Sequence, residues 1–345
     1  MRIKKNISKF IIKEDKKIDK AIENLNNLNP PILFVISKFN KFIGTLTDGD
    51  IRRHLLNKKK LNEKVVIAAN KKPITCKFKD IKKNQYYKKI LYKYNLKGIP
   101  ILKNNKIFSA FLALDDELNK TPIMIMAGGK GKRLLPFTKN LPKPLLQING
   151  KPIINYIIDN IIKEKFLNVY VSVNYKKGKI VKYFKINKNF GLNIKLINER
   201  SPLGTAGALY YLKNINEDNL ILINGDIITD LKLEKILSFH EQNKNLITVG
   251  CRNYQVQIPF GVIRSNKGKF KKIDEKPKYN NLINSGIYVI SKSIILKLLK
   301  PKKLSMIDLI EKTKKNRIGV FPLYEEWIDI GNKNDFFKMT EKNDY

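Results

Sequence analysis

The sequence has few of the residues that form metal clusters, disulfides or catalytic pairs. Its 345 residues include two cysteines, Cys76 and Cys251, and two histidines, His54 and His240. The cysteines have no metal-ligand spacing and form no disulfide framework, so we interpret them as ordinary buried or semi-buried thiols. The histidines lie in polar, helix-like surroundings, and we assign them no role. The sequence therefore offers no Ser-His or Cys-His pair for nucleophilic catalysis.

Long apolar runs are also missing. The longest, such as residues 32–36 and 122–127, have the length of a strand and are far too short to cross a bilayer. Residues 1–17 mix lysine with isoleucine and phenylalanine, without the continuous apolar core and small-residue cleavage site of a secretion signal. We therefore expect a cytoplasmic protein without membrane contact.

Acidic residues are scarce, since 30 Asp and Glu face 69 Lys and Arg, for a net charge of +39. Taken alone, this charge indicates a nucleic acid or an anionic membrane as partner. The excess is mostly lysine, accompanied by many asparagines and isoleucines, whose codons are rich in A and T, and it is spread along the whole chain. We therefore predict no specific nucleic-acid binding, although the charge should attract polyanionic substrates.

The chain is long enough for two or three domains, and its first 119 residues contain a repeat. Apolar patterning predicts the order helix, strand, strand, helix twice, which indicates an internal duplication of roughly sixty residues. The first copy comprises helix 18–28, strands 32–36 and 42–46 and helix 48–56; the second comprises helix 80–96, strands 99–102 and 107–114 and a short helix from Asp115.

The segment Gly44-Thr-Leu-Thr-Asp-Gly-Asp50-Ile-Arg-Arg53 resembles the end of a CBS repeat, where a strand leads through Thr-x-x-Asp into a helix. Two repeats form a CBS pair, an α+β regulatory module that often binds adenine nucleotides, and we expect residues 1–119 to be one. The resemblance implies that Thr47 and Asp50 hold the ribose and phosphate of a ligand, which suits a helix N-terminus and a carboxylate. The alternative, that both residues only cap a helix, stays open.

The second copy departs from this pattern. Ala113 stands where the threonine would be, although Asp116 is present. Because the second copy lacks the hydroxyl, we expect at most one working ligand site in the pair.

Residues 120–345 read as a separate α/β domain. Short apolar strands alternate with helical patterns, which predicts a doubly wound, mostly parallel sheet. The clearest strands are residues 122–127, 169–173, 194–197 and 220–223, and the clearest helix is residues 153–162.

A glycine-rich segment, Ala127-Gly-Gly-Lys-Gly-Lys-Arg133, follows the first of these strands, and Pro142-Lys143-Pro144 comes soon after it. Glycines let backbone amides approach phosphate oxygens, Arg133 offers a forked donor, and the prolines stiffen the backbone around Lys143. The segment lacks the Gly-Lys-Ser/Thr ending of a P-loop and the third glycine of a dinucleotide fingerprint.

Together these elements resemble the signature of the sugar-phosphate nucleotidyltransferases, typified by mannose-1-phosphate and glucosamine-1-phosphate guanylyltransferases. The resemblance implies a Rossmann-like, GT-A-like domain with a mixed, mostly parallel sheet. It also implies that the nucleotide is bound by the first loop and by the segment from Leu203 to Gly207, which resembles the base-recognition loop. Glu199 would accept from the base or position this loop. The implied nucleotide-binding residues are Ala127, Gly128, Gly129, Gly131, Arg133, Glu199, Gly204 and Thr205.

Further elements occur in the order that the family shows. Asn224-Gly225-Asp226 and Trp327-Ile-Asp329-Ile-Gly331 resemble the elements that carry two carboxylates for Mg²⁺, and carboxylates with phosphate oxygens and water suit that ion. The segments Glu275-Lys276-Pro277 and Asn284-Ser-Gly286 resemble the sugar-phosphate elements, with Lys276 neutralising the phosphate. The implied sugar-phosphate residues are Glu275, Lys276, Asn284 and Gly286.

The implied reaction joins a nucleoside triphosphate to a sugar-1-phosphate and releases pyrophosphate. The attacking phosphate is already ionised, so catalysis must bring two polyanions together and stabilise the added charge. The implied catalytic residues are Arg133, Lys143, Asp226, Lys276 and Asp329.

The substrates are less closely defined by the sequence. The resemblance favours GTP with a mannose-type or amino-sugar phosphate, for cell-surface glycan precursors, while UTP, CTP and dTTP remain open. We expect a homo-oligomer. The alternative is a binding protein, in which a CBS-based sensor of adenine nucleotides carries an inactive transferase fold.

Overall fold

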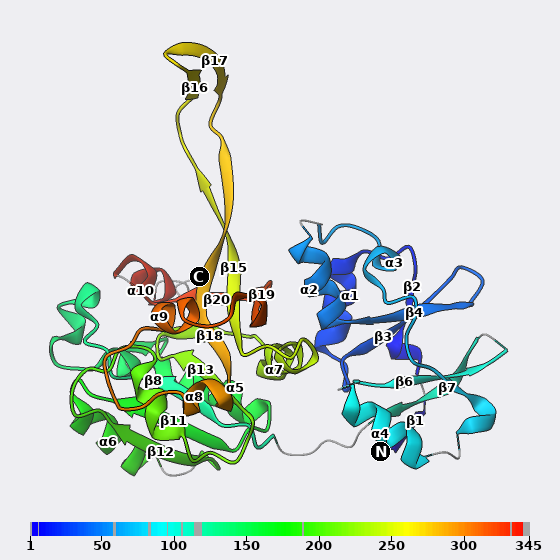
Figure 1. Ribbon diagram of the computed structural model, residues 1–345, viewed down its shortest axis with the longest axis horizontal. Helices are drawn as coiled ribbons and strands as arrows, with labels where there is room; N and C mark the ends of the chain where they lie inside the picture. The colour runs from blue at the N-terminus through cyan, green and yellow to red at the C-terminus, as the bar shows by residue number, and fades with distance from the viewer. Residues whose placement is uncertain are drawn as a thin grey trace. The chain divides into compact units, whose positions relative to one another are not determined.

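The computed structural model describes residues 2–5, 7–57, 60–81, 84–94, 96–104, 106–113, 119–187, 190–331 and 333–340. The chain forms two compact units, drawn in blue-to-cyan and in green-to-red in Figure 1. The N-terminal unit comprises Met1–Leu118 with Glu241–Asn243, and the C-terminal unit comprises Asn119–His240 and Lys244–Tyr345. The division lies beside the boundary expected from the sequence.

The N-terminal unit consists of two halves with the same order of elements. In each half a short strand pairs in parallel with the first strand of an antiparallel hairpin, and a helix connects the two. The first half contains β2 (Ile11–Lys13), α1 (Ile18–Asn26), β3 (Ile32–Ile36), β4 (Phe42–Thr47), α2 (Asp48–Leu56) and α3 (Val65–Ala68). The second contains β5 (Cys76–Lys77), α4 (Asn84–Lys93), β6 (Ile99–Lys103) and β7 (Lys106–Ala113), with β1 (Arg2–Lys5) beside β7. Asp115 and Asp116, where the last helix was expected, lie outside the described residues.

Aromatic side chains join the two halves. Phe111 of β7 packs edge-on against Phe34 of β3 and Phe10, with ring centroids 5.1 and 4.8 Å apart. All three rings are buried, so the two sheets share one core. Helix α1 adds Ile18 and Leu25, whose helical spacing places both on its buried face.

The C-terminal unit is built on a mixed sheet, in which the described residues form seven strands. Every neighbouring pair is parallel except the two made by β18, which runs against both of its neighbours. This confirms the mixed, mostly parallel α/β domain expected from the sequence. The order is β12 (Asn193–Asn198), β11 (Asn168–Val173), β8 (Ile123–Met126), β13 (Asn219–Asn224), β18 (Lys278–Ser291), β15 (Ile247–Gln257) and β19 (Ile318–Leu323).

Helices cover both faces of this sheet, which explains why its central strands are apolar throughout. Ile123 and Ile125 of β8 face one core, and Met124 between them faces the other. The first core includes α5 (Ile153–Lys163), α6 (Lys177–Ile186) and α7 (Leu233–Gln242); the second includes α8 (Lys292–Leu296) and α9 (Met306–Glu311).

Shorter pairs lie outside the large sheet. Strand β14 pairs antiparallel with β20, which carries the Trp-x-Asp element, and Phe336 of α10 packs in a small core with Ile330. The bounds are β9 (Gln147–Ile148), β10 (Lys151–Pro152), β14 (Ile227–Thr229), β20 (Trp327–Asp329) and α10 (Lys333–Thr340).

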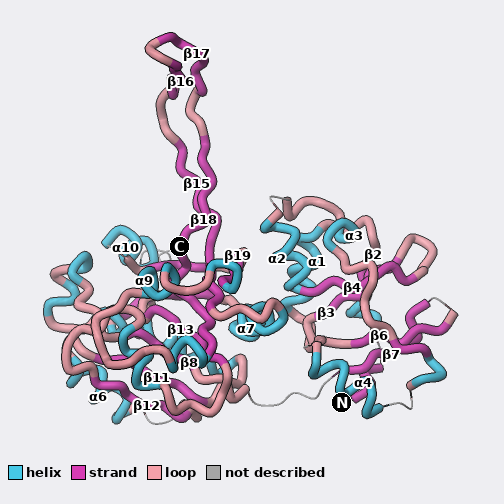
Figure 2. Tube along the Cα trace, viewed as in Figure 1, coloured by secondary structure: helices cyan, strands magenta, loops and turns pink. Residues whose placement is uncertain are grey.

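Two strands of the sheet continue far beyond it. Past residue 252, β15 pairs with β18 alone, because its pairing with β19 ends at Arg252. Figures 1 and 2 show the resulting ribbon projecting from the rest of the unit, with β16 (Val262–Asn266) and β17 (Lys269–Asp274) at its end. We call residues 252–283 the arm.

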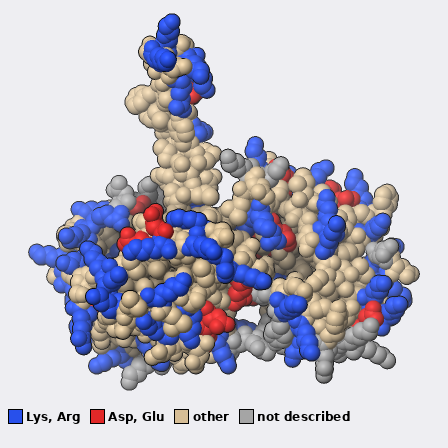
Figure 3. Space-filling model, in the orientation of Figure 1, with Lys and Arg blue, Asp and Glu red and all other residues tan. Residues whose placement is uncertain are grey.

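Two further sequence features can be located in the structure. Both cysteines are buried thiols, and Figure 3 shows Lys and Arg side chains spread over the visible surface rather than gathered in one patch. Across the described residues, no helix combines the length and apolar character needed to cross a membrane.

Candidate active site

The glycine-rich loop leaves the sheet at the carboxyl end of its central strand β8. Gly131 adopts a left-handed conformation (φ +60°), and a Cβ there would lie 2.8 Å from the Thr138 methyl group. The Thr138 hydroxyl also donates to the Gly131 carbonyl at 2.9 Å, which fixes the turn. By contrast, a Cβ on Gly129 would meet nothing within 4 Å. The loop therefore leaves open space beside its backbone, as an approaching phosphate requires.

A cleft opens between this loop and the end of β13. Arg133, on the short 3-10 helix Lys132–Leu134, is exposed there and makes no hydrogen bond or ion pair with a described residue. The lining residues are Met126, Ala127, Gly129, Gly131, Lys132, Arg133, Leu134, Lys143, Pro144, Gly225, Asp226 and Gly331.

The cleft brings Asp226 and Asp329 together, although they lie in distant parts of the chain. Asp226 follows β13, and the pairing of β14 with β20 places Asp329 opposite Ile227. The Ile330 amide donates to the Asp226 carbonyl at 3.1 Å, which fixes this register. The two carboxylates that the sequence suggested as a pair are therefore neighbours.

Cationic side chains accompany these carboxylates. Lys143 is 9% exposed, and its ammonium forms an ion pair with the Asp226 carboxylate. Burial, followed by the charge of Asp226, raises the pKa of the Asp329 carboxyl, and the charges of Lys143 and Arg133 oppose this rise. Arg133, Lys143 and Asp226 thus line the cleft, and their charges act on Asp329, which lies beside Asp226.

The carboxylate pair fits a divalent cation. Oδ1 of Asp226 and Oδ1 of Asp329 are both buried, and neither has a hydrogen-bond partner among the described residues. Buried oxygens without partners are costly, and a hard cation such as Mg²⁺ would satisfy them. The described residues provide no cluster of three or more metal-binding side chains, so phosphate and water would have to complete the coordination.

A family comparison agrees with this arrangement. The model of the nucleotidyl transferase family matches residues 123–344, which is most of the chain and all of the cleft. The chain belongs to the nucleotidyl transferase family. The resemblance inferred from the glycine-rich loop is therefore confirmed at the level of the family.

Named relatives give the range of this family. The chain is 30% identical over 227 residues to a mannose-1-phosphate guanyltransferase of Gibberella zeae, and 38% identical over 223 residues to a bifunctional protein GlmU of Methanococcus aeolicus. These matches cover 63% and 61% of the chain but only 62% and 52% of the relatives. The chain thus spans between half and two thirds of the length of these curated relatives.

Solved structures resemble the C-terminal unit. HddC from Yersinia pseudotuberculosis is 28% identical, with a TM-score of 0.52 over 64% of this chain and 99% of that one. A second HddC structure, complexed with GMP-PN, is 27% identical, with a TM-score of 0.51 and the same coverage of both chains.

In this nucleotidyl transferase unit, Glu199 supports the loop 203–207. Its carboxylate is buried and accepts from the Ser172 hydroxyl and, at 2.8 Å, from the Leu203 amide. It also lies against Gly128, where a Cβ would be 3.0 Å from Oε1. These contacts correspond to the second role that the sequence left open, positioning of the loop. Sequence reasoning missed Ser172, because a serine inside a strand gives no distinctive signal.

The small residues of that loop have a packing role that the sequence did not predict. Gly204 is left-handed (φ +74°), and a Cβ there would lie 2.6 Å from the Leu304 carbonyl. The Thr205 hydroxyl accepts from the Met306 amide at 2.8 Å. Residues 302–306 therefore pack against the loop and hold it in place. This segment carries no recognisable motif, so nothing in the sequence indicated this contact.

Asn284 and Gly286 lie on β18 beside the end of β13. Gly286 is left-handed (φ +73°), and a Cβ there would lie 2.7 Å from the Asn224 amide nitrogen. The Asn284 side chain accepts from the Gly286 amide at 3.0 Å and donates to the Tyr288 hydroxyl at 2.6 Å. The described contacts of Asn284 thus hold the local shape of β18. Asn224, which lies against Gly286, is a further polar residue two positions before Asp226.

Glu275 and Lys276, by contrast, lie on the arm. The paired stretch of β15 and β18 from Gln257–Lys278 to Arg252–Ile283 separates them from the sheet. The structure therefore does not bring them to the cleft lined by Arg133 and Asp226. Their expected role in sugar-phosphate binding stays a prediction, which the structure sets apart from the rest of the site.

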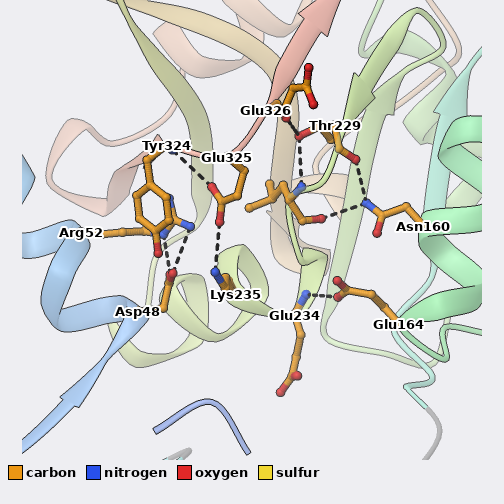
Figure 4. Close-up of polar contacts among 11 residues, drawn as sticks. Asp48, Arg52, Asn160, Glu164, Thr229, Glu234, Lys235, Tyr324, Glu325 and Glu326 are labelled. Carbon is orange, nitrogen blue, oxygen red and sulfur yellow. Dashed lines mark hydrogen bonds and ion pairs between the residues drawn. The ribbon is translucent and has the colours of Figure 1, made fainter. Parts of the chain in front are cut away.

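A group of polar residues joins the segments next to the two carboxylates (Figure 4). The Thr229 hydroxyl donates to the Glu326 carbonyl at 2.7 Å and so joins β14 to the segment before β20. Asn160 of α5 donates to the Leu231 carbonyl at 2.9 Å. Nearby, Lys235 and Glu325 form an ion pair at 3.1 Å with both side chains buried. These contacts fix β14, which directly follows Asp226, and β20, which carries Asp329.

Glu164 belongs to the same group. Its carboxylate accepts from the Glu234 amide at the start of α7, at 3.0 Å. Burial raises the pKa of this carboxyl to about 7, against the lowering effect of that hydrogen bond. His240 at the other end of α7 is bonded to the Thr248 and Ser291 hydroxyls, and burial lowers its pKa to about 4. Both groups lie away from the cleft residues and serve packing.

In the N-terminal unit, Thr47 and Asp50 form a capping box at the start of α2. One Asp50 oxygen accepts from the Thr47 amide (2.8 Å) and hydroxyl (2.6 Å), and the other accepts from Arg53 at 2.5 Å. Behind them, Arg52 forms a buried ion pair with Asp48 (Figure 4). Both residues therefore cap the helix in this structure, and ligand binding at Thr47 and Asp50 stays a prediction.

Proposed function

We propose that this protein transfers a nucleotidyl group from a nucleoside triphosphate to a sugar-1-phosphate, giving an NDP-sugar and pyrophosphate. The observation that carries the proposal is the pair of buried, unpartnered carboxylate oxygens on Asp226 and Asp329, beside Arg133 and an open glycine-rich loop. Family membership supports the reaction type. A cytoplasmic setting, where nucleoside triphosphates are abundant, fits this role.

The residues of the cleft suit an attack of one phosphate on another. The 127–131 loop has open space beside Gly129 that triphosphate oxygens can fill, and the free Arg133 guanidinium can follow the charge that builds at the α-phosphate. Lys143 neutralises Asp226 and so reduces its repulsion with Asp329 and with the entering phosphates. No side chain has to remove a proton, because the attacking phosphate oxygen is already ionised.

Asp226 and Asp329 are the residues that would hold Mg²⁺. The ion, when bound, supplies positive charge that offsets the phosphate oxygens. The two carboxylates are held in place for this by the β14–β20 pairing and its supporting hydrogen bonds.

GTP is the nucleotide that we propose, with a mannose-type or amino-sugar phosphate as acceptor. The support is the name of the Gibberella zeae relative, a mannose-1-phosphate guanyltransferase, and the HddC structure complexed with GMP-PN. A matrix of GTP, UTP, CTP, dTTP and ATP against mannose-1-phosphate, glucosamine-1-phosphate and glucose-1-phosphate, read by pyrophosphate release, tests both parts. We expect the fastest release with GTP. Faster release with another nucleotide would overturn the base assignment, and no release with any pair would overturn the reaction itself.

The sensor alternative predicts a different result. An inactive transferase fold would release no pyrophosphate yet still bind adenine nucleotides. The cleft argues against it, because it keeps Arg133, Lys143, Asp226 and Asp329 together in a charged arrangement.

For the N-terminal unit we propose a CBS pair that binds an adenine nucleotide at Thr47 and Asp50 and regulates the enzyme. The support is the duplicated order of elements and the position of both residues at the N-terminus of α2. Such regulation requires that the ligand prefer one of two states of the protein.

Calorimetry of the full chain with AMP, ADP, ATP and S-adenosylmethionine tests this. We expect binding that is lost in Asp50→Ala. Since that change also removes a helix cap, the matched control is Asp308→Ala, which removes the same kind of capping box at Ser305 in α9. Loss of binding in both variants, or no binding by the natural chain, would make Thr47 and Asp50 capping residues only.

A further inference from the structure

One face of the lower part of the arm is mostly apolar. Strand pairing places Tyr254 and Val256 of β15 on the same face as Tyr279 and Ile283 of β18. Tyr254 is 55% exposed and Val256 is 44% exposed, although both are large apolar side chains. The polar Asn281 also lies on this face, opposite Tyr254. The other face carries Asn253, Gln255, Gln257, Lys278 and Asn280, together with one exposed apolar residue, Leu282.

The end of the arm also has an apolar face and a charged face. Ile263 of β16 lies directly opposite Ile273 of β17, and Phe270 follows on that face. These three side chains are between 54% and 69% exposed. On the other face Arg264 and Lys272 form ion pairs with Asp274. Figure 3 shows a stretch of the arm with few charged side chains below an end rich in lysine and arginine.

Such a ribbon is incomplete by itself. An isolated two-stranded hairpin is marginally stable in water and needs another strand or a packing surface. A contiguous row of exposed apolar side chains marks a surface that another protein covers. The arm therefore requires a partner.

The root of the arm fixes the direction in which it points. Arg252 donates to the Trp327 carbonyl at 3.0 Å and lies over the indole ring, while the indole N–H donates to the Ser285 carbonyl at 2.8 Å. From Cys251–Asn284 to Gln257–Lys278 the pairing of the two strands is unbroken. The arm would have to break this root before Lys276 reached the cleft of its own chain.

Lys276 has the chemistry of a residue that awaits a ligand. It is exposed, and no described residue pairs with its ammonium. Its left-handed backbone (φ +43°) is shared by Lys267 at the end of the same arm. In the cleft, the Lys143 ammonium is already paired with Asp226. A reaction between two polyanions needs a further cation for the second phosphate, and within the arm Lys276 is free to supply it.

We propose that the arm of one copy of this protein docks on a second copy and carries Lys276 to the partner's cleft, where it binds the phosphate of the sugar-1-phosphate. This proposal rests on the proposed function. A second copy is the occupant because the cleft that Lys276 is expected to serve belongs to this same chain, while the paired strands of the arm hold Lys276 apart from its own cleft. Repulsion between two strongly basic chains is offset by the bound polyanions, so association strengthens when nucleoside triphosphate is present.

A mixture of two inactive variants tests the exchange. Lys276→Ala keeps the cleft and loses the cation, and Asp226→Asn loses the cleft and keeps the arm. If arms act between copies of a dimer, an equal mixture contains dimers with one intact site and recovers about a quarter of the natural rate of pyrophosphate release. Lys271→Ala, which changes a neighbouring exposed lysine, is the matched control and keeps full activity.

The outcomes separate the proposals. Full activity of Lys276→Ala, or no recovery in the mixture of two inactive variants, overturns delivery between copies and leaves the transferase function standing. A natural chain that releases no pyrophosphate with any substrate pair overturns the proposed function and Lys276 delivery with it.

The docking surface has its own measurement. Replacing Phe260 and Phe270 by serine removes apolar area at the arm's end without touching the cleft. Light scattering should show the natural chain as a dimer or larger, more so with GTP, and the double variant as a monomer with lowered activity. A natural chain that stays monomeric, and that binds phosphatidylglycerol vesicles through these two phenylalanines, would make the arm a lipid-binding element and refute the proposal.

Discussion

The cleft and the arm are two regions that the sequence assigned to one site, and they are built in opposite ways. In the cleft, Asp226 and Asp329 lie more than a hundred residues apart in the chain and are neighbours. Glu275 and Asn284 are only nine residues apart, yet the paired stretch of β15 and β18 separates Glu275, on the arm, from Asn284 at its root. Distance along the chain therefore says little, and the topology of the strands decides which residues meet.

The physical reason lies in what surrounds each region. Parallel strands in a buried sheet all end at one edge, so polar residues that follow them converge there. A hairpin that leaves the sheet has no such constraint, and its direction depends on contacts at its root, here Arg252 and Trp327. Substitutions in the cleft should therefore be poorly tolerated, while substitutions in the arm should lower activity without unfolding the protein.

The largest effect is expected at the carboxylates. Asp226→Asn and Asp329→Asn should each lower the rate of pyrophosphate release by about a hundredfold or more, the usual result of removing a charge contact to the reacting groups. Because burial and Asp226 raise the pKa of Asp329, its ionised form destabilises the fold at neutral pH. Asp329→Asn should thus raise the melting temperature without divalent cations, by about 2–4 °C per kcal/mol gained. Near-normal activity in either variant would end the metal assignment.

Replacing Arg133 should have the next largest effect, and it should change kcat more than KM. Arg133→Ala should lower kcat by roughly a hundredfold with a smaller rise in the KM for triphosphate, since its contact strengthens as charge builds. Steady-state kinetics separate the two constants. An unchanged kcat with a raised KM would mark Arg133 as a residue that binds the substrate alone.

The two glycines of the first loop provide a matched pair within the cleft. Gly131→Ala should cost about 1–2 kcal/mol of stability, because alanine disfavours the left-handed backbone and its Cβ would press on Thr138. Gly129→Ala should leave the free energy of unfolding unchanged and raise the KM for triphosphate several-fold, since its Cβ would occupy open space beside the loop. Urea denaturation and kinetics on both variants test this. Equal stability losses would show that the loop is only a structural turn.

The smallest effect is expected below the cleft, at Glu164. Its folded pKa of about 7 lies above the ordinary value of 4.5, so its contribution to stability falls as pH rises between these values and stays low above them. Glu164→Gln keeps an acceptor for the Glu234 amide and removes the charge. It should therefore stabilise the protein by about 1 kcal/mol at pH 8 and leave stability unchanged at pH 4.5. A stabilisation independent of pH would point to packing instead.

The sequence predicted the cleft well and the remainder unevenly. The apolar strand 122–127, the glycines after it and the strand-end Asp226 gave correct elements because buried parallel strands have a plain pattern. The support from Ser172 to Glu199 was not visible, since single hydrogen bonds between distant residues leave no pattern. The arm was missed because a strand pattern such as that of residues 253–257 does not show that a hairpin leaves its sheet, which depends on contacts at the root.

Strand β18 has a consequence for how the arm can change its length. It is a single strand of 14 residues, of which one end belongs to the arm and the other lies next to β13 in the core. Successive side chains of a strand alternate between its two faces. Removing one residue from each arm strand would therefore move every apolar side chain beyond the deletion to the opposite face of the arm. A change of two residues per strand keeps the faces and alters the reach by about 7 Å. The arm can therefore be resized only in whole steps of this kind, while the part of the same strand that pairs with β13 stays in register.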